Sequence, residues 1–113
     1  MTYVKPMIAA GNRRPLIWML LGRRTGDNAQ ALAVGRAVVE AVGGQALGKP
    51  LDYNALYHAP NQLLGASLRS LAAERRDLAP PWPDLVVGVG RRSVPVARWI
   101  STQSGGRAKL IQI

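Results

Sequence analysis

The sequence predicts an α/β fold: a doubly wound parallel sheet of about four strands in the order 2-1-3-4. Two continuous apolar runs, 16–21 and 85–89, are typical of strands covered on both faces. Each run is followed by a glycine-containing turn and then by apolar residues at helical spacing. Strands that alternate with helices favour a parallel sheet with right-handed crossovers.

The first strand and the first helix have clear sequence signals. Residues 16–21 are apolar throughout and end at a turn. Asp27 has the character of a helix N-cap, because its carboxylate can accept hydrogen bonds from the first turn of a helix. The helix is then expected over 28–42, and the glycine pair 43–44 ends it.

The middle of the chain predicts a short strand within 45–51 and then a loop, 52–60, that contains His58. The next residue, an asparagine, can cap a helix that runs over 61–75 with leucines along one face. The proline-rich stretch 79–83 predicts a rigid extended connector, because proline blocks helix formation.

The last part of the chain predicts a second strand–helix–strand unit. After the strand 85–89, Ser93 is expected to cap a helix that tolerates Pro95 in its first turn and runs to about Gln103. Residues 108–113 are expected to form the fourth strand. The predicted organisation is therefore a flexible basic arm, 1–14, and one α/β domain over 15–113.

Composition points to anionic partners. The chain has 113 residues, no cysteine, a net charge of +9 and an isoelectric point near 11.4, which excludes disulfides and thiolate chemistry. Such a charge favours phosphorylated metabolites, membrane surfaces or nucleic acid. A codon bias toward arginine is an equally good explanation of the charge, although not of where the arginines stand. The absence of cysteine suits the cytoplasmic location that we expect, and no segment is long and apolar enough to span a bilayer.

The tripeptide Gly-Arg-Arg occurs twice, at 22–24 and at 90–92, each time after an apolar run. In the order 2-1-3-4 the strand order reverses between the first and third strands, and ligands of such sheets bind at that point. We therefore expect both turns to flank one crevice and to bind an anion with arginine side chains and helix N-termini. The alternative is that these arginines are solvated turn residues. The predicted ligand-binding residues are Gly22, Arg23, Arg24, Thr25, Asn28, Gly90, Arg91, Arg92 and Ser93.

Asp27 is the candidate catalytic residue, because a carboxylate held ionised beside arginines can accept a proton from a substrate hydroxyl. Its alternative role is the helix cap described above. His58 is expected to be a surface or structural residue. The chain lacks a second histidine and a carboxylate cluster, so neither a metal nor a cofactor is expected. No nucleic-acid-binding motif is recognisable, so nucleic acid is the least favoured partner.

Four stretches together resemble the mitochondrial-fission Elm family, which occurs in plants and in many bacteria. They are GRRTGDNAQALAVGRAV, KPLDYN, LLGASLRSL and PPWPDLVVGVGRRSVPVARWISTQSGGRAKLIQI, and they span nearly everything from residue 15 onward. Bacterial members are often labelled nucleoside-diphosphate-sugar epimerases, although the Tyr-x-x-x-Lys pair of epimerases is absent here. The family itself resembles GT-B glycosyltransferases, whose two Rossmann-like domains face a cleft.

The resemblance implies that this chain is an incomplete GT-B-like N-terminal Rossmann-type domain, because the family continues beyond the equivalent of Ile113. A second domain would hold most of a nucleotide-sugar donor, so the chain alone is expected to be inactive, with Asp27 as the base of the complete enzyme. GT-B chemistry needs no bound metal.

Expected partners are a nucleotide-sugar or a phosphorylated acceptor. The alternative is a non-catalytic module that docks to a protein or to the inner membrane surface. Self-association through the last strand is also expected.

Overall fold

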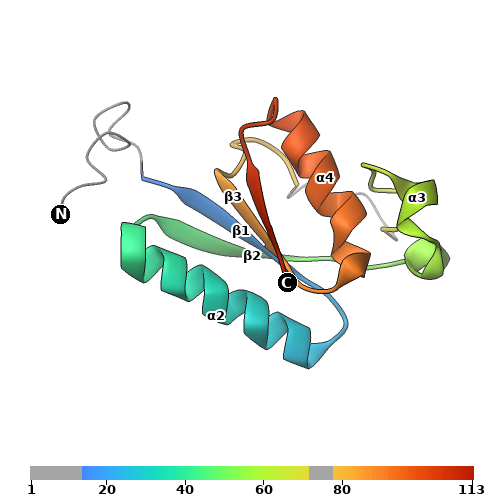
Figure 1. Cartoon of the computed structure of the whole chain (residues 1–113), viewed down its shortest axis with the longest axis horizontal. Coiled ribbons are helices and arrows are strands. Elements are labelled where there is room, and N and C mark those ends of the chain that lie inside the picture. The colour runs from blue at the N-terminus through green and yellow to red at the C-terminus, as the bar shows by residue number, and fades with distance from the viewer. Residues whose placement is uncertain (1–13, 72–77) are drawn as a thin grey trace.

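The structure of the protein is a computed structural model that describes residues 14–71 and 78–113. Within these residues the chain forms a four-stranded, fully parallel sheet in the order β2-β1-β3-β4, which confirms the predicted fold class (Figure 1). The strands are β1 (Leu16–Leu21), β2 (Gln45–Pro50), β3 (Leu85–Gly88) and β4 (Lys109–Gln112). The helices are α2 (Thr25–Val42), α3 (Asn61–Leu64) and α4 (Val94–Gln103), with the 3₁₀ turns η1 (Ala55–His58) and η2 (Arg91–Ser93).

Helices cover both faces of the sheet, with α2 on one side and α4 on the other (Figure 1). Alternate residues of β1 therefore enter two separate cores. Ile17 and Met19 pack with α2, whereas Trp18 and Leu20 pack with α4. This two-sided burial explains why the strand is apolar throughout instead of alternating with polar residues.

Helix α2 begins at Thr25, three residues earlier than the predicted 28–42, and ends at Val42 before a glycine with φ 78°. The predicted N-cap was wrong: the capping position is Arg24, and its side chain makes no capping hydrogen bond. Asp27 instead stands inside the first turn, where a carboxylate interacts favourably with the helix dipole. The turn before the helix is closed by Asn28, a residue of the helix itself, whose side chain hydrogen-bonds the backbone N–H and carbonyl of Gly22.

The predicted helix over 61–75 was also wrong in length, since α3 stops at Leu64. Gly65 follows with φ 57°, a backbone conformation that suits glycine and ends the helix. The residues after it are held by contacts from distant parts of the chain. The backbone N–H of Ser67 donates to the carbonyl of Pro95, and Tyr53 pairs with Leu71 in an antiparallel bridge. The stretch 72–77 lies outside the described residues, as does 1–13 of the predicted arm.

The other predicted elements are close to those observed. Strands β2 and β4 lie within the expected ranges, and residues 79–83 contain no helix or strand. The loop that was expected at 52–60 contains the 3₁₀ turn η1. Ser93 directly precedes α4 and Pro95 lies in its first turn, but the hydroxyl of Ser93 makes no capping hydrogen bond.

Asp84 ties three strands together at the amino end of the sheet. Its backbone N–H donates to the carbonyl of Leu16 at 2.7 Å, and its carboxylate accepts from the backbone N–H of Leu16 at 2.8 Å. The backbone N–H of Lys109 donates to the carbonyl of Asp84 at 3.0 Å, and Arg107 lies 3.5 Å from the carboxylate. Asp84 therefore aligns the starts of β1, β3 and β4, which leaves the opposite end of the sheet for the loops.

Three tryptophans form a row on the α4 side of the sheet. Trp18 is fully buried, and its ring centroid lies 5.9 Å from that of Trp82. Trp82 in turn meets Trp99 edge-on, with the centroids 5.8 Å apart. Aromatic rings at these separations and angles attract one another beyond simple area burial. The row fixes the connector before β3 against both the sheet and α4.

None of the helices in the described parts of the chain has the length and hydrophobicity that a membrane span requires.

Candidate functional site

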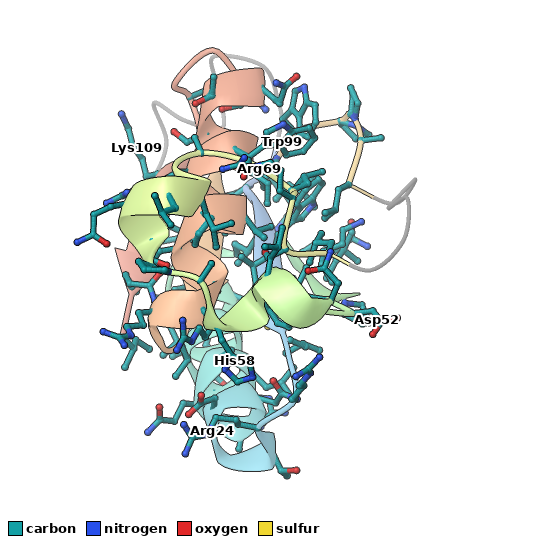
Figure 2. All side chains as sticks on the ribbon, turned by 90° about the vertical axis from the view of Figure 1, so that its right-hand side faces the viewer. Arg24, Asp52, His58, Arg69, Trp99 and Lys109 are labelled. Carbon is teal, nitrogen blue, oxygen red and sulfur yellow. The ribbon has the colours of Figure 1, made fainter. Side chains whose placement is uncertain are left out.

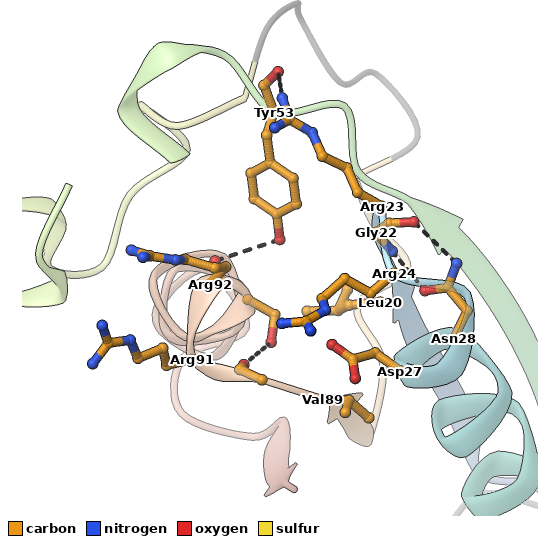
Figure 3. A pocket seen from close by; sticks show the side chains of 12 residues that line it. Leu20, Gly22, Arg23, Arg24, Asp27, Asn28, Tyr53, Val89, Arg91 and Arg92 are labelled. Carbon is orange, nitrogen blue, oxygen red and sulfur yellow. Dashed lines mark hydrogen bonds between the residues drawn. The ribbon is translucent and has the colours of Figure 1, made fainter. Parts of the chain in front are cut away.

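A pocket of about 350 Å³ opens at the carboxyl ends of β1 and β3, between the start of α2 and the turn η2 (Figure 3). The two Gly-Arg-Arg turns lie on opposite sides of it, at the point where the strand order reverses. Its size falls within the range of small-molecule sites, about 300–1,000 Å³. The position is the one at which open α/β sheets bind their ligands.

Every predicted site residue except Thr25 lines this pocket. The structure thus brings together residues 22–28 and 90–93, although their role in ligand binding stays a prediction. Three lining residues were missed: Leu20, Tyr53 and Val89. A signal for Tyr53 was present in the sequence, because it follows β2, whose carboxyl end lies at the same edge of the sheet.

The first turn is closed by Asn28. Its side-chain oxygen accepts a hydrogen bond from the backbone N–H of Gly22 at 2.8 Å, and its side-chain nitrogen donates to the carbonyl of the same glycine at 3.0 Å. The asparagine therefore pairs with Gly22 as a neighbouring strand would (Figure 3). Asn28 was predicted as a ligand donor, but both polar atoms of its amide are engaged, so its observed part is to position the turn.

The second turn depends on Gly90, which has φ 79° and ψ 155°, a region that L-residues with side chains strongly avoid. Its carbonyl accepts hydrogen bonds from the hydroxyl of Ser93 at 3.0 Å and from the side-chain nitrogen of Gln112 at 2.7 Å. Its N–H donates to the carbonyl of Ile113. The hydroxyl of Ser93 is therefore engaged by the turn itself, and the residue is buried.

Two of the four arginines are tied to backbone carbonyls. Arg23 donates to the carbonyl of Tyr53 at 2.8 Å, and its guanidinium lies 5.9 Å from the centre of the tyrosine ring. Arg92 donates to the carbonyl of Ala59 at 3.2 Å. The hydroxyl of Tyr53 completes the connection by donating to the carbonyl of Arg92 at 3.4 Å. Tyr53 therefore spans the pocket from the β2 side to η2 (Figure 3).

The other two arginines and the carboxylate are available to a ligand. Within residues 14–71 and 78–113, the side chains of Arg24, Arg91 and Asp27 make no hydrogen bond or ion pair. Figure 3 shows the guanidinium of Arg24 reaching toward the middle of the pocket, near the carboxylate of Asp27. The side chain of Arg91 extends away from Asp27, toward the other side of η2.

A sequence model of one protein family, described as Mitochondrial fission ELM1, matches residues 25–113. The chain belongs to the mitochondrial fission ELM1 family. The match extends from the start of α2 to the end of the chain, so it includes Asp27, Asn28 and the second Gly-Arg-Arg turn. The first Gly-Arg-Arg turn lies just before it. No curated protein and no solved structure matches the chain.

The chemistry that this member of the ELM1 family can perform at the pocket follows from its side chains. In the described parts of the chain no group of three or more histidine, aspartate or glutamate residues comes together to hold a metal ion. The pocket instead combines two unengaged guanidinium groups, one unengaged carboxylate and the uncapped N-terminus of an 18-residue helix. Guanidinium groups and helix N-termini attract phosphate and carboxylate groups, and a carboxylate can accept a proton.

Proposed function

We propose that the pocket between the two Gly-Arg-Arg turns binds the phosphate-bearing part of a small molecule, in a glycosyltransferase-like domain of an ELM1-family protein. One observation carries the proposal: Arg24 reaches into the pocket with no partner among the described residues, beside the uncapped N-terminus of α2. Arg24 is exposed, so its guanidinium group is accessible to a ligand, and it has no hydrogen-bond or ion-pair contact within the described residues. A bound phosphate group would supply that contact.

Asp27 supplies the chemical step in this proposal. The acceptor hydroxyl gives its proton to the carboxylate while its oxygen forms a bond to the sugar carbon. The bond between that carbon and the phosphate oxygen breaks, and the nucleoside diphosphate leaves. What favours Asp27 for this role is that its carboxylate lines the pocket without an ion pair among the described residues. A carboxylate engaged in an ion pair would be a weaker base.

The test for this chain is ligand binding, because GT-B glycosyltransferases divide donor and acceptor between two domains. Calorimetric titration with UDP-glucose and with inorganic pyrophosphate should give heat that depends on Arg24. Loss of one charge-assisted contact weakens binding by about tenfold or more, so Arg24→Ala should show at least that loss. Arg36→Ala is the matched control, because Arg36 is exposed on α2 and does not line this pocket.

Asp27→Asn separates binding from chemistry. Removal of a negative charge beside the arginines should leave phosphate affinity unchanged or raise it, whereas glycosyl transfer by the complete enzyme should be lost. Arg24→Ala binding as tightly as Arg36→Ala would overturn the assignment of the site. Transfer that survives Asp27→Asn would overturn the role of the base alone.

A second candidate function is docking to an anionic surface, which the net charge of +9 favours. The exposed Arg14 is the described part of the basic segment that would take part. Co-sedimentation with anionic vesicles that falls when Lys5, Arg13 and Arg14 are replaced by alanine, without any affinity for nucleotide-sugars, would favour docking over ligand binding.

A further inference from the structure

A second basic pocket, of about 370 Å³, is lined by residues of η1, α3, η2 and α4. It is separate from the site described above, but the two pockets share Arg91 and Arg92. The residues that line it include Arg91, Arg92, Arg98, His58, Asn61 and Gln62. Figure 2 shows His58 at the same end of the molecule as Arg24, which belongs to the first pocket.

Hydrogen bonds to backbone carbonyls fix the walls of this second pocket. The side-chain nitrogen of Asn61 donates to the carbonyl of Arg91 at 3.0 Å, and Arg92 donates to the carbonyl of Ala59 at 3.2 Å. These bonds hold η2 against the segment that contains η1 and α3. The side-chain oxygen of Asn61 is buried without a hydrogen-bond partner in the described structure.

Among the residues that the structure describes, the charges that line the second pocket are unbalanced. Three arginines line it, and no aspartate or glutamate among the described residues does so. Arg91 and Arg98 stand seven residues apart, about two helical turns, which brings them to the same side of α4 and the turn before it. Like charges around one cavity repel one another, and an anion bound between them relieves that repulsion.

Arg91 and Arg98 both have unengaged guanidinium groups, since neither side chain makes a hydrogen bond or ion pair within residues 14–71 and 78–113. In Figure 3 the side chains of Arg91 and Arg92 extend away from Asp27 and thus away from the carboxylate of the first pocket. A planar guanidinium fork matches the oxygens of a phosphate group.

From this arrangement we propose that the second pocket is a distinct phosphate-binding site, formed by Arg91, Arg92 and Arg98. It takes a phosphate monoester, carried either by a soluble metabolite or by a lipid headgroup. The inference rests on the arginine cluster and does not require the first pocket to be occupied.

Amide NMR during titration of the full chain with inorganic phosphate tests the proposal. The amides of Gln62 and Arg98 should shift. Arg98→Ala should weaken that response by about tenfold or more, because one charge-assisted contact is lost. Arg98→Lys should retain part of it, and Arg36→Ala should leave it unchanged, since Arg36 lines neither phosphate pocket. The proposal is overturned if those amides do not respond, or if Arg98→Ala behaves like Arg36→Ala.

Each pocket has at least one arginine that does not line the other pocket, so single variants can distinguish the two sites. Arg24 lines the first and not the second, and Arg98 lines the second and not the first. Arg24→Ala should therefore reduce the shifts of Gly26 and Asp27 and spare those of Gln62. If Gly26 and Asp27 never respond while Gln62 does, the proposed function fails and the second site stands.

Glycerol 3-phosphate and vesicles of phosphatidylcholine with phosphatidic acid distinguish the two sources of phosphate. Binding of the soluble ester that depends on Arg98 identifies a metabolite, and vesicle binding that depends on Arg98 identifies a headgroup. Either result supports the site. Binding of neither ligand overturns it.

Discussion

The carboxylate of Asp27 lies directly against Gly90, so that a Cβ added to this glycine would stand 3.3 Å from Asp27 Oδ2. The two residues come from different turns, 63 positions apart in the sequence, and both line the pocket. The backbone conformation favours glycine at this position, and any side chain there would also require the carboxylate to shift by a few tenths of an ångström.

Gly90→Ala should therefore destabilise the protein by about 1–3 kcal/mol, the cost of holding a side-chain-bearing residue in this backbone region. Denaturant unfolding measures the change. Gly26→Ala is the control, because Gly26 lies in the first turn of α2 with open space around its Cβ position and should lose no stability. Equal stability of Gly90→Ala and the wild type would show that the turn can relax.

Asn28→Ala should lower the free energy of unfolding by about 1–3 kcal/mol, because the N–H and the carbonyl of Gly22 each lose their side-chain partner. Thermal unfolding measures the loss. Asn28→Asp keeps the acceptor and places a charge that suits a helix N-terminus, so it should recover part of the stability. If both variants unfolded at the wild-type temperature, the two hydrogen bonds between Asn28 and Gly22 would contribute nothing to stability.

Asp84→Ala should cost about 1–3 kcal/mol, because the backbone N–H of Leu16 then has no acceptor at the start of β1. Asp52→Ala is the matched control. Asp52 is exposed, its side chain makes no hydrogen bond among the described residues, and its removal should change stability by less than about 0.5 kcal/mol. The prediction fails if the two variants unfold at the same denaturant concentration.

Strand β4 is an edge of the sheet, and the apolar side chains of Leu110 and Ile113 beside it are exposed. Edges of this kind pair with other copies of a chain. We propose concentration-dependent self-association, measurable by sedimentation, which Leu110→Lys should reduce. The opposite edge, β2, carries Lys49 and Pro50, residues that blunt such pairing. A wild-type chain that stays monomeric at high concentration would contradict the proposal.

The sheet could be predicted because burial on both faces gives a strong signal in a short stretch. Residues 16–21 and 85–88 show that signal, and the alternation with helices then restricts the strand order. The helix predicted to run from Asn61 to residue 75 was wrong in length because long-range contacts override the local pattern. Leu64 and Leu71 have helical spacing and are both buried, yet distant partners hold the backbone between them in another conformation. Such partners cannot be recognised from local periodicity.

The meeting of the two Gly-Arg-Arg turns at one pocket could be predicted, since strand order alone places them there. The sequence could not predict which of the four arginines bind backbone carbonyls and which remain available to a ligand. Arg23 and Arg92 are engaged by carbonyls of Tyr53 and Ala59, which belong to an irregular segment without a sequence signature. Asn28 was likewise indistinguishable from a ligand donor until its partner, Gly22, was seen.

The row of Trp18, Trp82 and Trp99 contains every tryptophan of the chain. Intrinsic fluorescence is consequently a spectroscopic reporter of a single place, the layer between the sheet and α4. Circular dichroism averages over both layers, including the 18 residues of α2. If the two signals change at the same denaturant concentration, the layers unfold as one cooperative unit; a gap between them would show that α2 melts separately.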